Sequence, residues 1–264
     1  MPSFEDIVTH VGKFIGDADP SCDIKRLAPE ITQADALRIQ LAWKRKLEAA
    51  GDRIIGHQAS FTSTGVRKLF PDSPNPMVGT LLRSLARDDG EEIEMAAERC
   101  FVEAEVALIL KRDLEGPDLT DREVLSAIDS FLPSIEIAPL RPGPLALVHS
   151  YEHMIAVQKA PGGFVFFGQR TTATKGIDLR LEGCLVSLDG EPKVGATGFE
   201  AMGSPLKVVA AMARKMHEIG EKLHEGQVLM TGSLPQPPIM THDHRVARAE
   251  FATLGGVTVR LAGK

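Results

Sequence analysis

Apolar residues near the start of the chain recur at the three- and four-residue spacing of a helix. They are Phe4, Ile7, Val8, Val11 and Phe14. A second helix is predicted over residues 31–52, with Thr32 as its N-cap and Gly51 at its end. Residues 1–52 are therefore expected to form a helical N-terminal region.

From residue 53 onward the pattern changes to short apolar runs separated by glycine and proline, which is typical of strands. Residues 53–63, 98–110 and 133–140 predict strands, and several more strands and hairpins are expected toward the C-terminus. One long helix, residues 204–223, interrupts them. Residues 53–264 are thus expected to form an α/β domain.

Between the second and third of these strands the pattern becomes helical. Residues 119–132 predict an amphipathic helix in which Thr120 is the N-cap and Glu123 completes a capping box. The apolar face of this helix is expected to hold Val124, Ile128 and Phe131.

Composition narrows the class of protein. The chain has 264 residues, of which 43% are hydrophobic and 25% charged, as in ordinary globular proteins. A net charge of −6 disfavours a nucleic-acid partner. No apolar run approaches the length of a membrane span or a signal peptide, so no membrane partner is expected. Three dispersed cysteines, Cys22, Cys100 and Cys184, favour a reducing compartment, and the cytoplasm is expected.

Two acidic residues interrupt an otherwise apolar predicted strand. Glu103 and Glu105 are two positions apart, so in a strand their side chains point to the same face. Glu136 stands in the next apolar strand segment. Carboxylates this close repel each other unless a cation lies between them. Oxygen ligands of this kind suit Mg²⁺ or Mn²⁺, but the spacing alone fits a solvated strand face equally well.

Further segments carry a family resemblance: GHQASFTS, PNPMVGTLL, FVEAEVALILKRDL, AIDSFLPSIEIAPLR and the helix-to-turn stretch that ends in MTGSL. In order and separation they resemble the 2-keto-4-pentenoate hydratase / 4-oxalocrotonate decarboxylase family, within the fumarylacetoacetase-like superfamily. The resemblance covers the chain from about residue 53. It implies an α/β fumarylacetoacetase-like fold, a mixed and strongly curved β-fold with decorating helices.

The resemblance also implies a site. The three glutamates would bind Mg²⁺ or Mn²⁺, and the metal would chelate a 2-oxo acid substrate and stabilise enolate charge. Thr231, Gly232 and Ser233 would contact the substrate. The implied reaction is hydration of a 2-hydroxy-2,4-dienoate in the catabolism of aromatic compounds. Relatives decarboxylate, isomerise or cleave carbon–carbon bonds, commonly as homo-oligomers, and hydratase and decarboxylase subunits associate.

Three polar positions depart from the family pattern. Gln58 stands where the family has an acid/base lysine, Met77 replaces an acidic residue, and Gln158 with Lys159 replaces an Asp-Asn pair. Gln58 is still expected to touch the ligand, because an amide donates hydrogen bonds although it does not transfer protons. His57 and Lys159 are candidates for the missing catalytic group, although strand alternation turns His57 away from Gln58.

Two histidine pairs offer other candidates. His242 and His244 have no third soft ligand nearby in sequence and follow a Pro-rich loop that is expected to be exposed. His149 and His153 would share a helix face, and a surface or lid role is expected for them. The chain has no nucleophile elbow, dinucleotide fingerprint or P-loop.

Three interpretations remain open from the sequence. The first is a metal-dependent hydratase or decarboxylase. The second is a diverged enzyme that performs another enolate reaction needing no lysine, such as isomerisation or carbon–carbon hydrolysis. The third is a catalytically weak partner of a homologous subunit.

Overall fold

Helices border two β-sheets in the computed structural model, which describes residues 2–15, 19–73, 76–140, 149–158, 163–169 and 176–262. The helices are α1 (Phe4–Lys13), α2 (Ile24–Leu27), α3 (Gln33–Ala49), α4 (Thr64–Leu69), α5 (Asp121–Ala127), α7 (Tyr151–Ala156) and α8 (Pro205–Glu218), with 3-10 turns η1 (Pro20–Cys22), η2 (Arg83–Leu85) and η3 (Gly198–Glu200). None of these helices is both long and apolar enough to cross a bilayer.

The strands are β1 (Ile54–Ser60), β2 (Met77–Leu82), β3 (Ala86–Asp88), β4 (Glu92–Ile93), β5 (Arg99–Leu110), β6 (Ile128–Pro139), β7 (Phe164–Phe167), β8 (Gly183–Leu188), β9 (Glu191–Thr197), β10 (Val228–Met230), β11 (Ile239–Thr241), β12 (Val246–Phe251) and β13 (Gly255–Leu261). The larger sheet has the order β2-β1-β10-β5-β6-β7-β3, and β11 also pairs with β5. The smaller sheet has the order β4-β13-β12-β8-β9.

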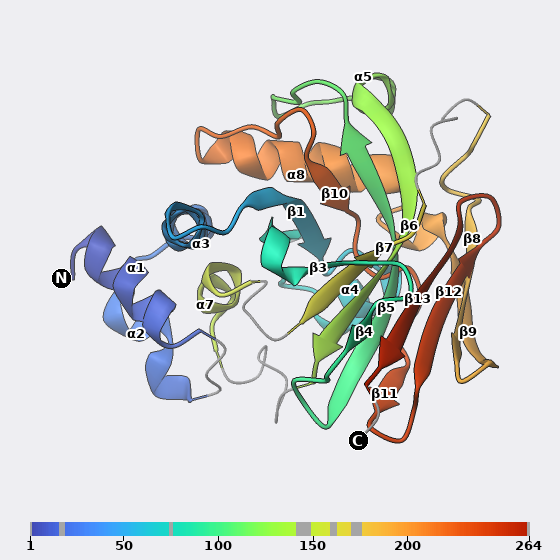
Figure 1. Ribbon diagram of the computed structural model, residues 1–264. Coiled ribbons are helices and arrows are strands. Elements are labelled where there is room, and N and C mark those ends of the chain that lie inside the picture. The colour runs from blue at the N-terminus through green and yellow to red at the C-terminus, as the bar shows by residue number, and fades with distance from the viewer. Residues whose placement is uncertain are drawn as a thin grey trace.

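Both sheets are mixed, because β1 with β10, β3 with β7 and β4 with β13 are parallel pairs among antiparallel ones. The larger sheet curls around the long strands β5 and β6, and β12 and β13 pack against β6 (Figure 1). The expected α/β fold, a mixed and curved β-structure with decorating helices, is confirmed.

The N-terminal helices hold the end of α7. Helix α3 begins at the expected N-cap Thr32, whose hydroxyl accepts from the backbone N–H of Asp35. Further along α3, Gln40 donates to the carbonyl oxygen of Ile155 at 2.5 Å. Trp43 donates through its indole N–H to the carbonyl oxygen of Ala156 at 2.7 Å. The bond from Trp43 satisfies a carbonyl that a helix end leaves without an intrahelical partner, and the bond from Gln40 adds a second donor to Ile155. The division of the chain into two domains at residue 53 stays a prediction.

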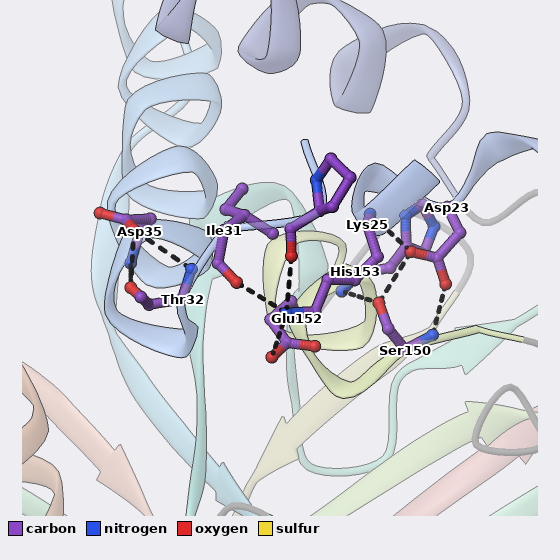
Figure 2. Close-up of polar contacts among 9 residues, drawn as sticks. Asp23, Lys25, Ile31, Thr32, Asp35, Ser150, Glu152 and His153 are labelled. Atoms are coloured by element: carbon purple, nitrogen blue, oxygen red, sulfur yellow. Dashed lines mark hydrogen bonds and ion pairs between the residues drawn. The ribbon is translucent and has the colours of Figure 1, made fainter. Parts of the chain in front are cut away.

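A second polar contact joins the segment before α2 to the start of α7 (Figure 2). The Asp23 carboxylate accepts from the Ser150 hydroxyl at 2.7 Å and from the Ser150 backbone N–H. The backbone N–H of Ile24 donates to Nδ1 of His153 at 3.3 Å. His153 stacks on His149 with ring centroids 4.3 Å apart, and both side chains are buried. The expected surface position of this pair is therefore wrong, because these contacts hold the pair beneath the N-terminal segment, and the lid role stays a prediction.

The helix predicted over residues 119–132 is correct only in its first half. The capping box at Thr120 is confirmed, but α5 ends at Ala127 and β6 begins at Ile128. Phe131 pairs with Leu108 of β5. Strand β6 is buried on both faces along most of its length, so its sequence lacks the apolar–polar alternation that marks a half-exposed strand.

We expect the buried His153 to make stability depend on pH. Burial lowers its pKa to about 4, and the neighbouring His149 acts in the same direction. The unfolded chain, with an ordinary histidine pKa of about 6.5, therefore takes up a proton that the folded protein excludes. This contribution to stability is complete above pH 6.5. It should be lost as the pH falls toward 4, by up to about 3 kcal/mol.

Thermal unfolding measured from about pH 7.5 to about pH 4.5 tests this pH dependence. The His153→Asn variant keeps an acceptor for the Ile24 N–H but does not titrate, so its melting temperature should fall less at acid pH. The matched variant His217→Asn, at an exposed position, should behave as the parent does. An unchanged pH dependence in His153→Asn would contradict the assignment.

Candidate metal centre

The two longest strands bring three glutamates together. Glu103 and Glu105 point to one face of β5, and the antiparallel register places Glu136 of β6 directly opposite Glu103. One carboxylate oxygen of each residue lies within 4.8 Å of the others. Glu105 is fully buried, Glu136 is 7% exposed and Glu103 is half-buried. Three negative charges this close, two of them buried, favour a positive partner, and their oxygens suit a hard divalent cation.

Gln58 on β1 reaches the same carboxylates across β10. Its Nε2 donates to Oε1 of Glu105 and to Oε2 of Glu136, each at 2.5 Å. The side chain is fully buried. Its Oε1 is also buried and has no hydrogen-bond partner among the residues that the structure describes. The amide therefore joins two of the three carboxylates and keeps one acceptor unused.

The turn after β10 contacts Glu105. The backbone N–H of Gly232 donates to Oε2 of Glu105 at 2.8 Å. Thr231 donates its hydroxyl to the Val106 carbonyl oxygen at 2.9 Å, and Thr62 donates to the Thr231 carbonyl oxygen at the same distance. Gly232 has a φ of +85°, and a Cβ there would lie 2.2 Å from Oγ1 of Thr62. Only glycine fits this position without displacing its neighbours.

The other predicted site residues are placed differently. His57 lies on the face of β1 opposite Gln58, with Nδ1 3.4 Å from Oγ1 of Thr80. Burial lowers the pKa of His57 to about 4, so the ring is neutral at pH 7. Its position and charge do not favour proton transfer at the carboxylates. Ser233 donates its hydroxyl to a backbone carbonyl two residues on, at 2.9 Å. Lys159 lies outside the described residues.

The histidine pairs add no second metal-type cluster within the described ranges, where the three glutamates are the group found. His244 accepts the Thr241 N–H through Nδ1 at 3.1 Å, next to β11. The Pro-rich segment before His242 was expected to be an exposed loop, and this is only partly correct. It contains β11, and Met240 there is fully buried against β5.

Ser60 is a candidate site residue that the sequence did not indicate, and it contacts Gln158, which the family comparison had marked as a changed polar position. Ser60 follows Gln58 by two positions, so the two share a face of β1. Gln158, just beyond α7, donates from Nε2 to Oγ of Ser60 at 2.6 Å, and both residues are half-buried. Strand alternation could have indicated Ser60. No local spacing relates Gln158 to β1.

Comparisons with known proteins relate most of the chain to enzymes of known activity. No protein-family model matches the chain. It is 31% identical over 209 residues to the 2-hydroxyhexa-2,4-dienoate hydratase of Comamonas testosteroni, which covers 78% of each chain. It is 30% identical over 244 residues to the TodF product hydratase of Pseudomonas putida, which covers 90% of this chain and 88% of that one.

Among solved structures, the 4-oxalocrotonate decarboxylase from Pseudomonas putida G7, complexed with magnesium and adipate, matches with a TM-score of 0.85. The match covers 99% of both chains at 24% identity, and it shows that the two proteins share a fold.

We expect alanine at position 232 to destabilise the protein for two reasons. The positive φ strains any residue with a Cβ, and the new methyl group would meet Thr62. Together these should cost at least about 2 kcal/mol in the free energy of unfolding. Gly220 has a φ of +77° and open space around its Cβ position, so Gly220→Ala measures the backbone cost alone. Chemical denaturation should show a clearly larger loss for Gly232→Ala, and equal losses would contradict the steric argument.

Proposed function

Because the chain belongs to the 2-keto-4-pentenoate hydratase / 4-oxalocrotonate decarboxylase family, we propose that it is a metal-dependent lyase acting on a 2-oxo or 2-hydroxydienoic acid. The reaction that we assign first is hydration of a 2-hydroxy-2,4-dienoate, in the catabolism of aromatic or related compounds. The observation that carries the proposal is the group of three glutamates whose ligand oxygens lie within 4.8 Å of one another.

The three glutamates would hold Mg²⁺ or Mn²⁺. Such a cation supplies a Lewis acid that polarises a 2-oxo group and favours the enolate form of the acid. Hydrogen bonds from two other parts of the chain orient these carboxylates. The Gly232 backbone N–H donates to Glu105, and the Gln58 side chain on β1 donates to both Glu105 and Glu136. Partners of this kind fix the orientation of metal ligands. We assign the turn of Thr231, Gly232 and Ser233 to the substrate side of the site.

An apolar cluster adjoins the carboxylates on the larger sheet. Ala107 follows Glu105 by two positions on β5, so the two share a face. The cluster is made of Leu81, Ala86, Ala107, Leu132, Val165, Val228 and Met230. Apolar surroundings exclude water and strengthen electrostatic interactions nearby. They also suit the hydrocarbon part of a dienoic acid.

Gln58 favours a second candidate function. An amide does not transfer protons, so proton transfer falls to water or to a group outside the described residues, for which Lys159 is our candidate. The same feature supports an enolate reaction that needs no lysine, or a catalytically weak subunit that assists a homologous hydratase or decarboxylase.

We propose a homo-oligomer in the cytoplasm. Cys22, Cys100 and Cys184 are buried free thiols.

The metal site can be tested by calorimetry. The double variant Glu103→Ala/Glu105→Ala removes two carboxylates and should abolish measurable Mg²⁺ and Mn²⁺ binding. Glu92 and Glu94 have the same two-residue spacing but are exposed, so Glu92→Ala/Glu94→Ala should bind the metals as the parent does. Parent-like affinity in the first double variant would refute the site.

The reaction can be followed by ultraviolet absorbance with 2-hydroxy-2,4-dienoates and 2-oxo diacids. We expect Mg²⁺-dependent loss of the dienol band without release of CO₂. Release of CO₂ would assign decarboxylation instead. Activity that appears only after Gln58→Lys would contradict hydration as the native reaction. A silent parent that activates a co-expressed homologue would support the partner-subunit function.

A further inference from the structure

Among the described residues, the amide of Gln58 has hydrogen-bond partners for its NH₂ group but not for its oxygen. Its NH₂ group donates to Glu105 and Glu136, whereas its Oε1 is buried with no hydrogen-bond partner in the described part of the chain. Burying an amide oxygen without a partner is unfavourable. The side chain nevertheless ends beside two of the three carboxylates. Carboxylates accept hydrogen bonds, so they use the NH₂ group of the amide and offer nothing to its oxygen.

We propose that Gln58 is a fourth ligand of the cation and binds it through Oε1. The inference rests on the proposed function, because it presupposes the metal that the glutamates hold. Hard divalent cations accept side-chain amide oxygens as well as carboxylates. A glutamine at this position therefore completes a set of four oxygen donors from three strands, β1, β5 and β6.

The orientation of the amide follows the charge around it. Two carboxylates attract the positive NH₂ end of the amide dipole, and the structure shows this orientation. A cation that contacts the same two carboxylates repels the NH₂ group and attracts the carbonyl oxygen. The last torsion of a glutamine side chain is broad and roughly two-fold. Rotation about it by half a turn exchanges nitrogen and oxygen with little movement elsewhere.

The surrounding hydrogen bonds permit this rotation. Oε1 has no described partner to give up. Glu105 keeps its bond from the Gly232 N–H when the bond from Gln58 is lost. After rotation the NH₂ group takes the place that Oε1 had, and there it can donate to an oxygen of the bound acid. Gln58 then contacts both the metal and the substrate.

The number of water molecules coordinated to Mn²⁺ tests the proposal directly. Gln58→Met keeps the length and the apolar stem of the side chain but removes both amide atoms. If Oε1 is a ligand, this variant should bind Mn²⁺ about tenfold more weakly. It should also hold about one more coordinated water, since a six-coordinate ion fills the open position. Titration calorimetry gives the affinity, and water-proton relaxation gives the water count. Gln227→Met, which alters a half-buried glutamine on the approach to β10, is the matched control and should change neither.

The water count separates a ligand from a residue that only orients the glutamates. Weaker binding with an unchanged water count would overturn the proposal, as would unchanged affinity. Both results would leave the metal centre intact. A parent that binds no Mn²⁺ would instead refute the proposed function, and the Gln58 inference with it.

Infrared spectroscopy provides a measurement that needs no variant. In parent protein carrying glutamine labelled with ¹³C at the side-chain carbonyl, Mg²⁺ should move one carbonyl band to lower wavenumber. Spectra that do not change while calorimetry shows Mg²⁺ binding would overturn the proposal even if Gln58→Met failed to fold.

Discussion

Electrostatic repulsion among three carboxylates sets the main constraint on this fold. At about 5 Å and an effective dielectric constant of about 20, each pair of charges repels by roughly 3 kcal/mol. Strands β5 and β6 nevertheless place Glu103 and Glu136 directly opposite each other. The donors that offset this repulsion come from distant parts of the chain. Gln58 lies on β1 and Gly232 follows β10, so the strand order β1-β10-β5-β6 brings both donors to the cluster.

Features encoded by local chemistry could be predicted from the sequence. Alternation along one strand placed Glu103 and Glu105 on the same face, and side-chain caps identified Thr32 and Thr120 as helix starts. Pairing between strands could not be predicted in this way. The register that brings Glu136 opposite Glu103 depends on the whole length of β5 and β6, and α5 lies between them in the chain.

The predictions that the structure contradicts failed for physical reasons as well. Residues 128–132 were predicted to be helical because a clear start signal preceded them and the first helix stop after it is Pro133. Burial on both faces then hid the strand pattern. The histidines before and within α7 were expected near the surface because a polar residue at helical spacing usually faces water. Their burial depends on contacts with the segment that contains Asp23, more than a hundred residues away.

The bonds from α3 to α7 have a consequence for how this protein can diversify. Gln40 and Trp43 fix the carbonyls of Ile155 and Ala156, and two residues later Gln158 contacts the strand that carries Gln58. The N-terminal helices are thereby connected to the rim of the proposed site, whereas the three carboxylates lie on β5 and β6. Under the proposed function, substitutions in α3 would therefore act first on Gln158 and Ser60 at the rim and not on the three glutamates. The three glutamates and the contacts that run from α3 to Gln158 thus lie in separate stretches of the chain, and β1, which carries both Gln58 and Ser60, joins the two.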